Sequence, residues 1–107
     1  METVGIDASI QDAAQAVLES RCRTIFVTDK ELALLGSVTE GDLVRAFLRG
    51  LNPKASVRHV MNSNPLFFDE SASLEDVKFL MSRGGHLAIP IVDSQRKLIK
   101  VIKQSEV

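Results

Sequence analysis

The sequence predicts an α/β fold built from two copies of one unit, and two observations carry that prediction. Residues 8–12, ASIQD, resemble residues 72–76, ASLED, which lie 64 positions later. The same offset places the apolar run 25–29 over 89–93, and each run ends in Asp. Each unit therefore reads as strand, helix, strand, hairpin, strand and helix, with residues 2–4 left for the first opening strand.

The first helix of each unit is indicated by its apolar spacing and its cap. Apolar residues recur every three or four positions after residue 10 and after residue 74, as on a helix with one buried face. Ser9 and Ser73 stand at N-cap positions, and Asp12 and Asp76 follow three residues later. This spacing is typical of a capping box, with Asp in place of the commoner Glu.

The hairpin strands and closing helices follow from the same alignment. Residues 34–38 match 97–101, with one residue fewer in the second hairpin loop. A helix is predicted over 39–49, with Leu43, Ala46 and Phe47 as its apolar stripe and Gly50 just beyond its end. The repeat also predicts a closing helix from about Ile102, yet the sequence stops at residue 107. We expect an excised piece of a longer chain, the alternative being a natural chain with a frayed last helix.

The predicted organisation is a first unit over 1–50, a linker over 51–65 and a second unit over 66–107. The linker holds one helical turn at 56–61, which the Asn- and Pro-containing stretch 62–65 breaks. Residues 66–68 open the second unit as a strand. Gly84 and Gly85 are expected to end its first helix.

Composition excludes several classes of function. Thirteen basic and fourteen acidic residues give a net charge of −1, so no overall field recruits nucleic acid or a membrane. The single cysteine, Cys22, rules out an internal disulfide framework and fits a reducing cytoplasm. No apolar run approaches the roughly 20 residues of a membrane span. Cys22, His59 and His86 are too scattered for a metal site, and no catalytic set is evident, so we expect a non-enzymatic chain.

Two further segments carry a resemblance to a known family. Residues 35–43, LGSVTEGDL, are similar to the Gly-h-h-Thr-x-x-Asp signature of CBS domains, and 57–65 has the form Val-x-x-Val-Met-x-x-x-Pro. The whole chain therefore resembles a tandem CBS pair, also called a Bateman module. Residues 36–65 are also similar to CBS pairs attached to sugar-nucleotide nucleotidyltransferases. The resemblance implies a pseudo-twofold module, with middle strands packed together, helices outside, and a homodimer.

The chemistry of this motif suits a nucleotide. A Thr39 hydroxyl at a helix start can cap backbone N–H groups or bond a phosphate, and a helix N-terminus favours anions. An Asp42 carboxylate can accept hydrogen bonds from both ribose hydroxyls, and Gly36 lets a flat ring approach the strand. The resemblance implies these roles. It further places the strand backbone of Gly36, Ser37 and Val38 around adenine, and Thr3, Arg23 and Thr24 along the same cleft, with Arg23 near a phosphate. The plain alternative is an ordinary capping box.

The second copy of the motif departs from the first in this alignment. It has Ile99, Ile102 and Ser105 where the first has glycine, threonine and aspartate, so no ribose carboxylate remains. We therefore expect at most one competent site, or weak binding in the second cleft through Lys100, Lys103 and His86.

The predicted function is a regulatory module that senses AMP, ADP or ATP and controls an attached catalytic domain. The resemblance of residues 36–65 implies that this domain is a sugar nucleotidyltransferase. The module requires no cofactor, and the nucleotide is its regulatory ligand. The alternative is a structural dimerisation module with a vestigial cleft.

Overall fold

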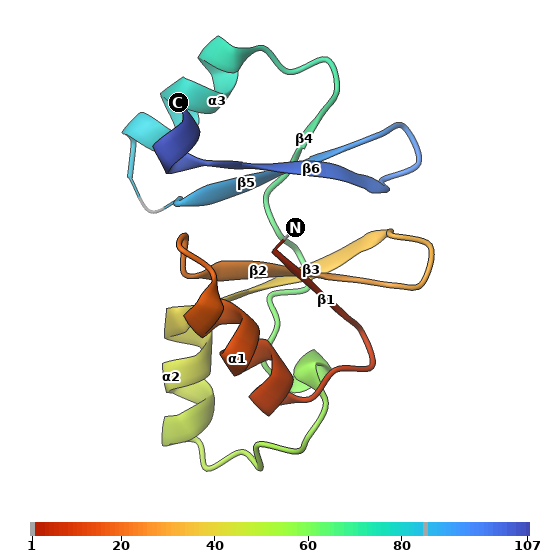
Figure 1. The fold of residues 1–107 in the computed structure, drawn as a ribbon, viewed down its shortest axis with the longest axis vertical. Coiled ribbons are helices and arrows are strands. Elements are labelled where there is room, and N and C mark those ends of the chain that lie inside the picture. The colour runs from red at the N-terminus through yellow and green to blue at the C-terminus, as the bar shows by residue number, and fades with distance from the viewer. Residues whose placement is uncertain (1, 85) are drawn as a thin grey trace.

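The computed structural model describes residues 2–84 and 86–107, in which two three-stranded sheets lie face to face with helices on their outer sides (Figure 1). This confirms the predicted α/β class and the packing of middle strands between helices. The first unit comprises β1 (Thr3–Gly5), α1 (Ile10–Glu19), β2 (Thr24–Thr28), β3 (Leu34–Thr39) and α2 (Glu40–Leu48). In its sheet, β1 pairs parallel with β2, and β2 pairs antiparallel with β3.

The second unit follows a 3₁₀ turn, η1 (Val57–His59), which confirms the turn predicted in the linker. It comprises β4 (Phe68–Asp69), α3 (Leu74–Ser82), β5 (Ala88–Val92), β6 (Leu98–Lys103) and the 3₁₀ turn η2 (Gln104–Glu106). Both opening strands lie later than predicted, and β4 is shorter. The closing helix predicted from Ile102 is wrong at its start, because Ile102 and Lys103 still pair with β5.

The hairpin pairing also corrects the alignment of the two repeats. Thr24 pairs with Thr39 and Ala88 with Lys103, and both hairpins contain a register shift at the same place. The offset of 64 therefore holds throughout, and the prediction of one residue fewer in the second loop is wrong. The second-copy counterparts of the glycine, threonine and aspartate are accordingly Lys100, Lys103 and Glu106, in place of Ile99, Ile102 and Ser105.

The two hairpin loops have matching geometry and bind each other. Asp29 Oδ1 accepts from the amides of residues 31 and 33, and Asp93 Oδ1 accepts from those of 95 and 97. Leu32 and Arg96 both have positive φ, at 69° and 65°. The Leu34 amide donates to the Arg96 carbonyl (3.1 Å) and the Leu98 amide to the Leu32 carbonyl (2.8 Å). Backbone hydrogen bonds thus join the two units at their hairpin ends.

An apolar cluster that includes the single cysteine lies between the sheets. Its members are Cys22, Phe26, Leu34, Ala88, Val92, Leu98 and Val101, with Phe67 packed against them. Burial of these side chains is what holds the two units face to face.

The helix ends follow the local rules. Both predicted capping boxes form, since Ser9 and Ser73 each accept from the backbone amide of an Asp three residues on. Gly50 and Gly84 follow the C-caps of α2 and α3 with φ of 72° and 81°, whereas Gly85 lies outside the described residues. The predicted apolar stripe of α2 holds for Leu43 and Ala46, which pack in the first core, and is wrong for Phe47, which is 82% exposed at the edge of the groove between α1 and α2. Within the described residues no helix has the length and apolar content of a membrane span.

Candidate functional site

A cavity of about 270 Å³ opens between the two units, which we call the first cleft. β2 and β3 of the first unit form one wall, the loop after η1 forms the floor, and the residues entering β5 form the other wall. Its lining residues are Thr24, Phe26, Ser37, Thr39, Asn62, Asn64, Pro65, Leu66, His86, Leu87, Ala88 and Ile89. Hydroxyl, amide and imidazole groups therefore converge on an otherwise apolar slot.

The structure brings together three of the eight predicted site residues on this wall: Thr24, Ser37 and Thr39. Val38 faces the opposite way and is fully buried in the core of the first unit. Thr3 lines a different cavity, beside Glu19 and Ser20.

Gly36 serves close packing against the linker. A Cβ at this position would lie 2.8 Å from the Asn62 carbonyl oxygen and 2.8 Å from the Met61 sulfur. The amide of Ser37 donates to that same Asn62 carbonyl, and the Asn62 amide donates back to the Ser37 carbonyl. The space predicted for a flat ring beside Gly36 is therefore occupied by the linker.

Thr39 and Asp42 form a capping box at the start of α2 beside the cleft. Asp42 Oδ2 accepts from the Thr39 amide (2.8 Å) and hydroxyl (3.0 Å), while the Thr39 Oγ1 accepts from the Asp42 amide (3.2 Å). Asp42 Oδ1 is paired with Arg45 at 2.6 Å. Both carboxylate oxygens thus have partners, and a ribose bound by Asp42 must take the place of Arg45.

Arg23 lies at the same helix start and outside the lining residues. Its carbonyl accepts from the Glu40 amide (3.2 Å), and its guanidinium Nε lies 3.8 Å from Glu40 Oε2. Both side chains are mostly exposed, so this pair is weak and exchanges readily with an anion.

Sequence reasoning missed the linker and β5 side of the cleft. The sequence assigns residues 62–65 a role as a helix break and as part of the family motif but not as site residues, yet Asn62 and Asn64 line the cavity. Asn62 Oδ1 accepts from the Asn64 amide (3.0 Å). The prediction that places His86 in the second cleft is wrong, because His86 lines the first cleft. The cluster of asparagines was the available signal, but only the fold shows which wall it forms.

The second cleft, which is the cavity lined by Arg21, Cys22, Leu87, Lys103, Gln104 and Ser105, also departs from expectation. Lys103 Nζ pairs with Glu2 Oε1 at 2.7 Å, and Lys100 lines a cavity on the outer face of the sheet. Lys100, Lys103 and His86 therefore do not converge, and the proposed weak site is wrong. The prediction that no carboxylate remains is wrong as well. Glu106 accepts from the Lys103 amide at 2.9 Å, as Asp42 does from Thr39.

Charge is balanced within the Glu2–Lys103 pair. Burial raises the pKa of Glu2, but the hydrogen bond and charge of Lys103 outweigh it and hold the pKa below its usual value. The hydrogen bond from Lys103 to Glu2 raises the pKa of Lys103. Lys103, which lines the second cleft, is thus neutralised by Glu2, whereas the first cleft presents hydroxyls and amides.

The first cleft is equipped to bind. Its hydroxyls, amides and the N-terminus of the nine-residue α2 suit an anionic, hydroxyl-bearing ligand. Within residues 2–84 and 86–107, no three His, Cys, Asp or Glu side chains gather to hold a metal ion.

Comparison with known proteins agrees with this architecture. The family model of the CBS domain matches residues 1–49 and again 57–107. The chain belongs to the CBS domain family. It is a CBS pair, and its two matched segments correspond to the two structural units.

Solved CBS pairs share the fold over almost the whole chain. The structure of CBSX2 in complex with AMP has a TM-score of 0.80 at 26% identity, and the match covers 98% of this chain and 82% of that chain. Staphylococcus aureus OpuCA has a TM-score of 0.74 at 27% identity, and the match covers 97% of this chain and 85% of that chain.

The curated relatives that this chain matches are much longer proteins. An uncharacterized protein of Helicobacter pylori is 29% identical over 96 residues, which are 88% of this chain and 29% of the relative. The A-adding tRNA nucleotidyltransferase of Aquifex aeolicus is 30% identical over 63 residues, 59% of this chain and 8% of the enzyme. The CBS pair thus spans under a third of the length of each.

Proposed function

We propose that this CBS pair is a regulatory module whose first cleft binds an adenosine nucleotide, AMP, ADP or ATP. The observation that carries the proposal is the cavity between the units, with Thr39 on its wall at the N-terminus of α2 and Asp42 in contact with Thr39. A similar chain, CBSX2, is described in complex with AMP, which supports an adenosine ligand.

Different side chains of the first cleft bind the phosphate, the ribose and the base. The Thr39 hydroxyl binds phosphate at the N-terminus of α2, where the helix dipole favours negative charge. Asp42 binds the ribose hydroxyls once Arg45 has left its Oδ1. The apolar wall of Leu66, Leu87 and Ile89 packs against the base.

Regulation follows from the position of the cleft between the two units. Hydrogen bonds join the units at their hairpin ends, while the first cleft has walls from both units. A ligand that touches both walls favours one relative arrangement, provided its affinity for the two arrangements differs. The proposed recipient is an attached catalytic domain, and residues 36–65 support a sugar nucleotidyltransferase through their resemblance alone.

The test is isothermal titration of the chain with AMP, ADP and ATP, beside Thr39→Ala and Asp42→Ala. We expect about one nucleotide per chain, with binding lost in both variants. Ser73→Ala and Asp76→Ala are matched controls, because they break the same kind of capping box in α3 and leave the first cleft intact. Equal loss of binding in the controls, or no heat from a folded wild type, contradicts the proposal.

A second candidate function is a structural dimerisation module, and the exposed apolar surface favours it. The large apolar side chains that are at least half exposed on the helices are Leu18, Val44, Phe47, Leu48, Leu74 and Phe79. Phe47 also borders an apolar groove between α1 and α2. Exposed apolar side chains on the helices of both units suit a homodimer.

Light scattering at micromolar concentration tests the homodimer, with Phe47→Glu expected to give a monomer. If that monomer still binds nucleotide as the wild type does, sensing and assembly are separate properties. A monomeric wild type contradicts the homodimer. It does not bear on the nucleotide proposal, which the isothermal titration tests.

A further inference from the structure

The lining and the edge of the first cleft bear on which nucleotide it binds. Its twelve lining side chains are three hydroxyls, two amides, one imidazole and six apolar groups. The charge of a phosphate bound there is therefore balanced by groups at the edge of the cleft. The charged side chains at the start of α2 are Glu40, Asp42 and Arg45, with Arg23 beside them.

The side chain of Arg45 reaches back over the first turn of α2, toward Thr39. Its Nη2 lies 2.6 Å from Asp42 Oδ1, and a Cβ on Gly41 would lie 3.5 Å from its Nη1. The same Cβ would lie 3.7 Å from Thr39 Oγ1. The guanidinium and the hydroxyl therefore border one position beside Gly41, which this glycine leaves without a side chain. A phosphate at that position is within reach of both groups at the helix N-terminus.

The ion pair that holds Arg45 is one that a nucleotide can exchange. The side chain of Asp42 is only 16% exposed, whereas that of Arg45 is 67% exposed. A ribose that takes Asp42 Oδ1 therefore releases a cation next to the position beside Gly41. A largely exposed ion pair contributes little stability, whereas a bidentate contact of arginine with phosphate is stronger. The exchange of partners by Arg45 is thus favourable only when the ligand carries a phosphate.

Glu40 and Arg23 limit the number of phosphates. Glu40 is the first residue of α2, and Arg23 Nε lies 3.8 Å from its carboxylate. Each further phosphate adds negative charge near Glu40, and Arg23 is already shared with that carboxylate. A second or third phosphate therefore gains less than the first.

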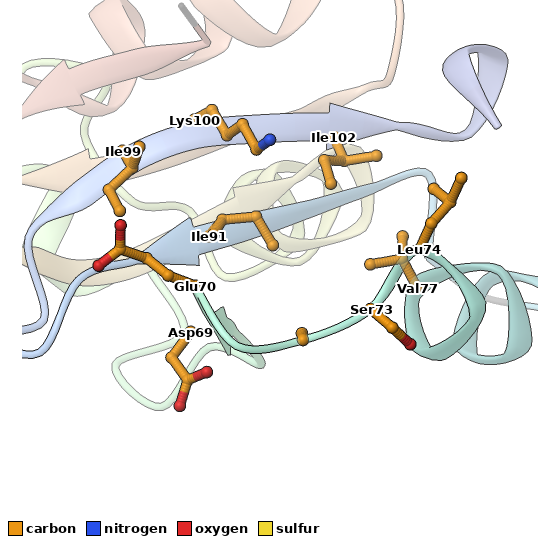
Figure 2. Close-up of a pocket in the computed structure, with 10 residues that line it drawn as sticks. Asp69, Glu70, Ser73, Leu74, Val77, Ile91, Ile99, Lys100 and Ile102 are labelled. Carbon is orange, nitrogen blue, oxygen red and sulfur yellow. The ribbon is translucent and has the colours of Figure 1, made fainter.

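An open groove of about 320 Å³ on the outer face of the second sheet is less suited to phosphate (Figure 2). Its lining combines aliphatic side chains of α3, β5 and β6 with Asp69, Glu70 and Lys100. Figure 2 shows the two carboxylates toward one end of this groove. Two carboxylates against one lysine disfavour an anion, so this groove does not compete with the first cleft for a nucleotide.

We propose that Arg45 makes the first cleft selective for a nucleoside monophosphate. The ribose hydroxyls displace Arg45 from Asp42, and Arg45 and Thr39 then bind the single phosphate beside Gly41. This inference rests on the proposed function and narrows its ligand from AMP, ADP or ATP to AMP. It makes Arg45 the residue that determines specificity for the phosphate.

Isothermal titration with adenosine, AMP and ATP tests the proposal in the wild type and in Arg45→Gln. In the wild type we expect AMP to bind at least about tenfold more tightly than adenosine and than ATP. In Arg45→Gln we expect the affinity for AMP to fall about tenfold, because the phosphate loses its cation. The affinity for adenosine should stay the same or rise, because Arg45 no longer competes for Asp42. Arg49→Gln is the matched control: it removes a cation at the other end of α2 and should leave all three affinities unchanged.

A second variant, Gly41→Ala, separates the phosphate position from the stability of α2. The added methyl meets its neighbours at ordinary distances of 3.5 Å or more, and alanine favours a helix more than glycine does. We therefore expect Tm to stay the same or rise. The affinity for AMP should fall at least about fivefold, because the methyl fills the position of the phosphate, while the affinity for adenosine is unchanged.

Three results overturn the proposal and leave the proposed function standing. They are ATP binding as tight as AMP binding in the wild type, equal losses of adenosine and AMP affinity in Arg45→Gln, and unchanged AMP affinity in Gly41→Ala. A folded wild type that binds neither adenosine nor AMP contradicts the proposed function and this inference together.

Discussion

The two units of this CBS pair have matching local structure and differ in what covers them. Both use Ser–Asp capping boxes, Asp-based hairpin loops and the same strand register. Among the described residues, however, the outer core of the first unit contains nine buried side chains and that of the second contains three. The difference arises because α2 and residues 51–60 close the first core, whereas the second has an open groove beside it.

The same comparison explains the two clefts. Thr39 and Lys103 occupy equivalent positions, but Lys103 carries a charge and is paired with Glu2. The second cleft therefore has an ion-paired lysine where the first presents a hydroxyl to its cavity. One repeat can thus keep its backbone design while a single side chain changes what its cleft can bind.

The largest expected effect is the loss of stability when an equivalent isoleucine is truncated in each of the two cores. Ile25 and Ile89 are counterparts and are 0% and 1% exposed. We expect Ile25→Ala to lower the free energy of unfolding by about 4 kcal/mol, because the closed first core cannot collapse around the void. We expect about 2 kcal/mol for Ile89→Ala, since the neighbouring groove gives the second core room to relax. Urea unfolding monitored by circular dichroism measures both; equal losses would contradict the contrast.

A smaller effect is expected at the strand position where the linker covers one unit only. Gly36→Ala places a methyl 2.8 Å from a backbone carbonyl of the linker, so the linker must shift. We expect a loss of about 1–3 kcal/mol, as in overpacked cores. The counterpart Lys100→Ala faces the open groove and should change stability by less than about 0.5 kcal/mol. Thermal melts of the two variants check this, and a stable Gly36→Ala protein would show that the linker contact is dispensable.

Features set by neighbouring residues were predictable from the sequence, whereas contacts between distant segments were not. The caps at Ser9 and Ser73 follow from residues three apart, and Gly50 follows from its position after a helix. The alignment of the second motif failed because Leu98 and Ile99 are both apolar and match the first hairpin in either register. Only the strand pairing distinguishes the two alignments.

The candidate site was predicted on one wall and missed on the other. Thr24, Ser37 and Thr39 lie on adjacent strands of one unit, where the repeat and the motif determine the pattern. Asn62 and His86 reach the same cavity from a loop and from the second unit. Their placement depends on how the units pack, which no local pattern encodes.

The N-caps of α1 and α3 should stabilise the protein equally if a cap is independent of what covers its unit. We expect Ser9→Ala and Ser73→Ala each to cost about 1 kcal/mol, because each removes one bond to an N3 amide. Urea unfolding of both variants tests this. A clearly larger loss for Ser9→Ala than for Ser73→Ala would contradict the independence of the caps from the cover.

The smallest effect is expected at the ion pair that distinguishes the second cleft. The pKa of Glu2 is lowered overall, so its stabilising contribution is complete above the usual value of 4.5 and is lost as pH falls through the lowered pKa. The pKa of Lys103 is raised, so its contribution is complete below 10.5 and is lost as pH rises through the raised pKa. Glu2→Gln should therefore lower Tm slightly between pH 5 and 10, with the difference from wild type vanishing in acid and again in strong base. Melting curves across this range test it. A difference that persists well below pH 4 would show that Glu2 stabilises the chain by packing rather than by charge.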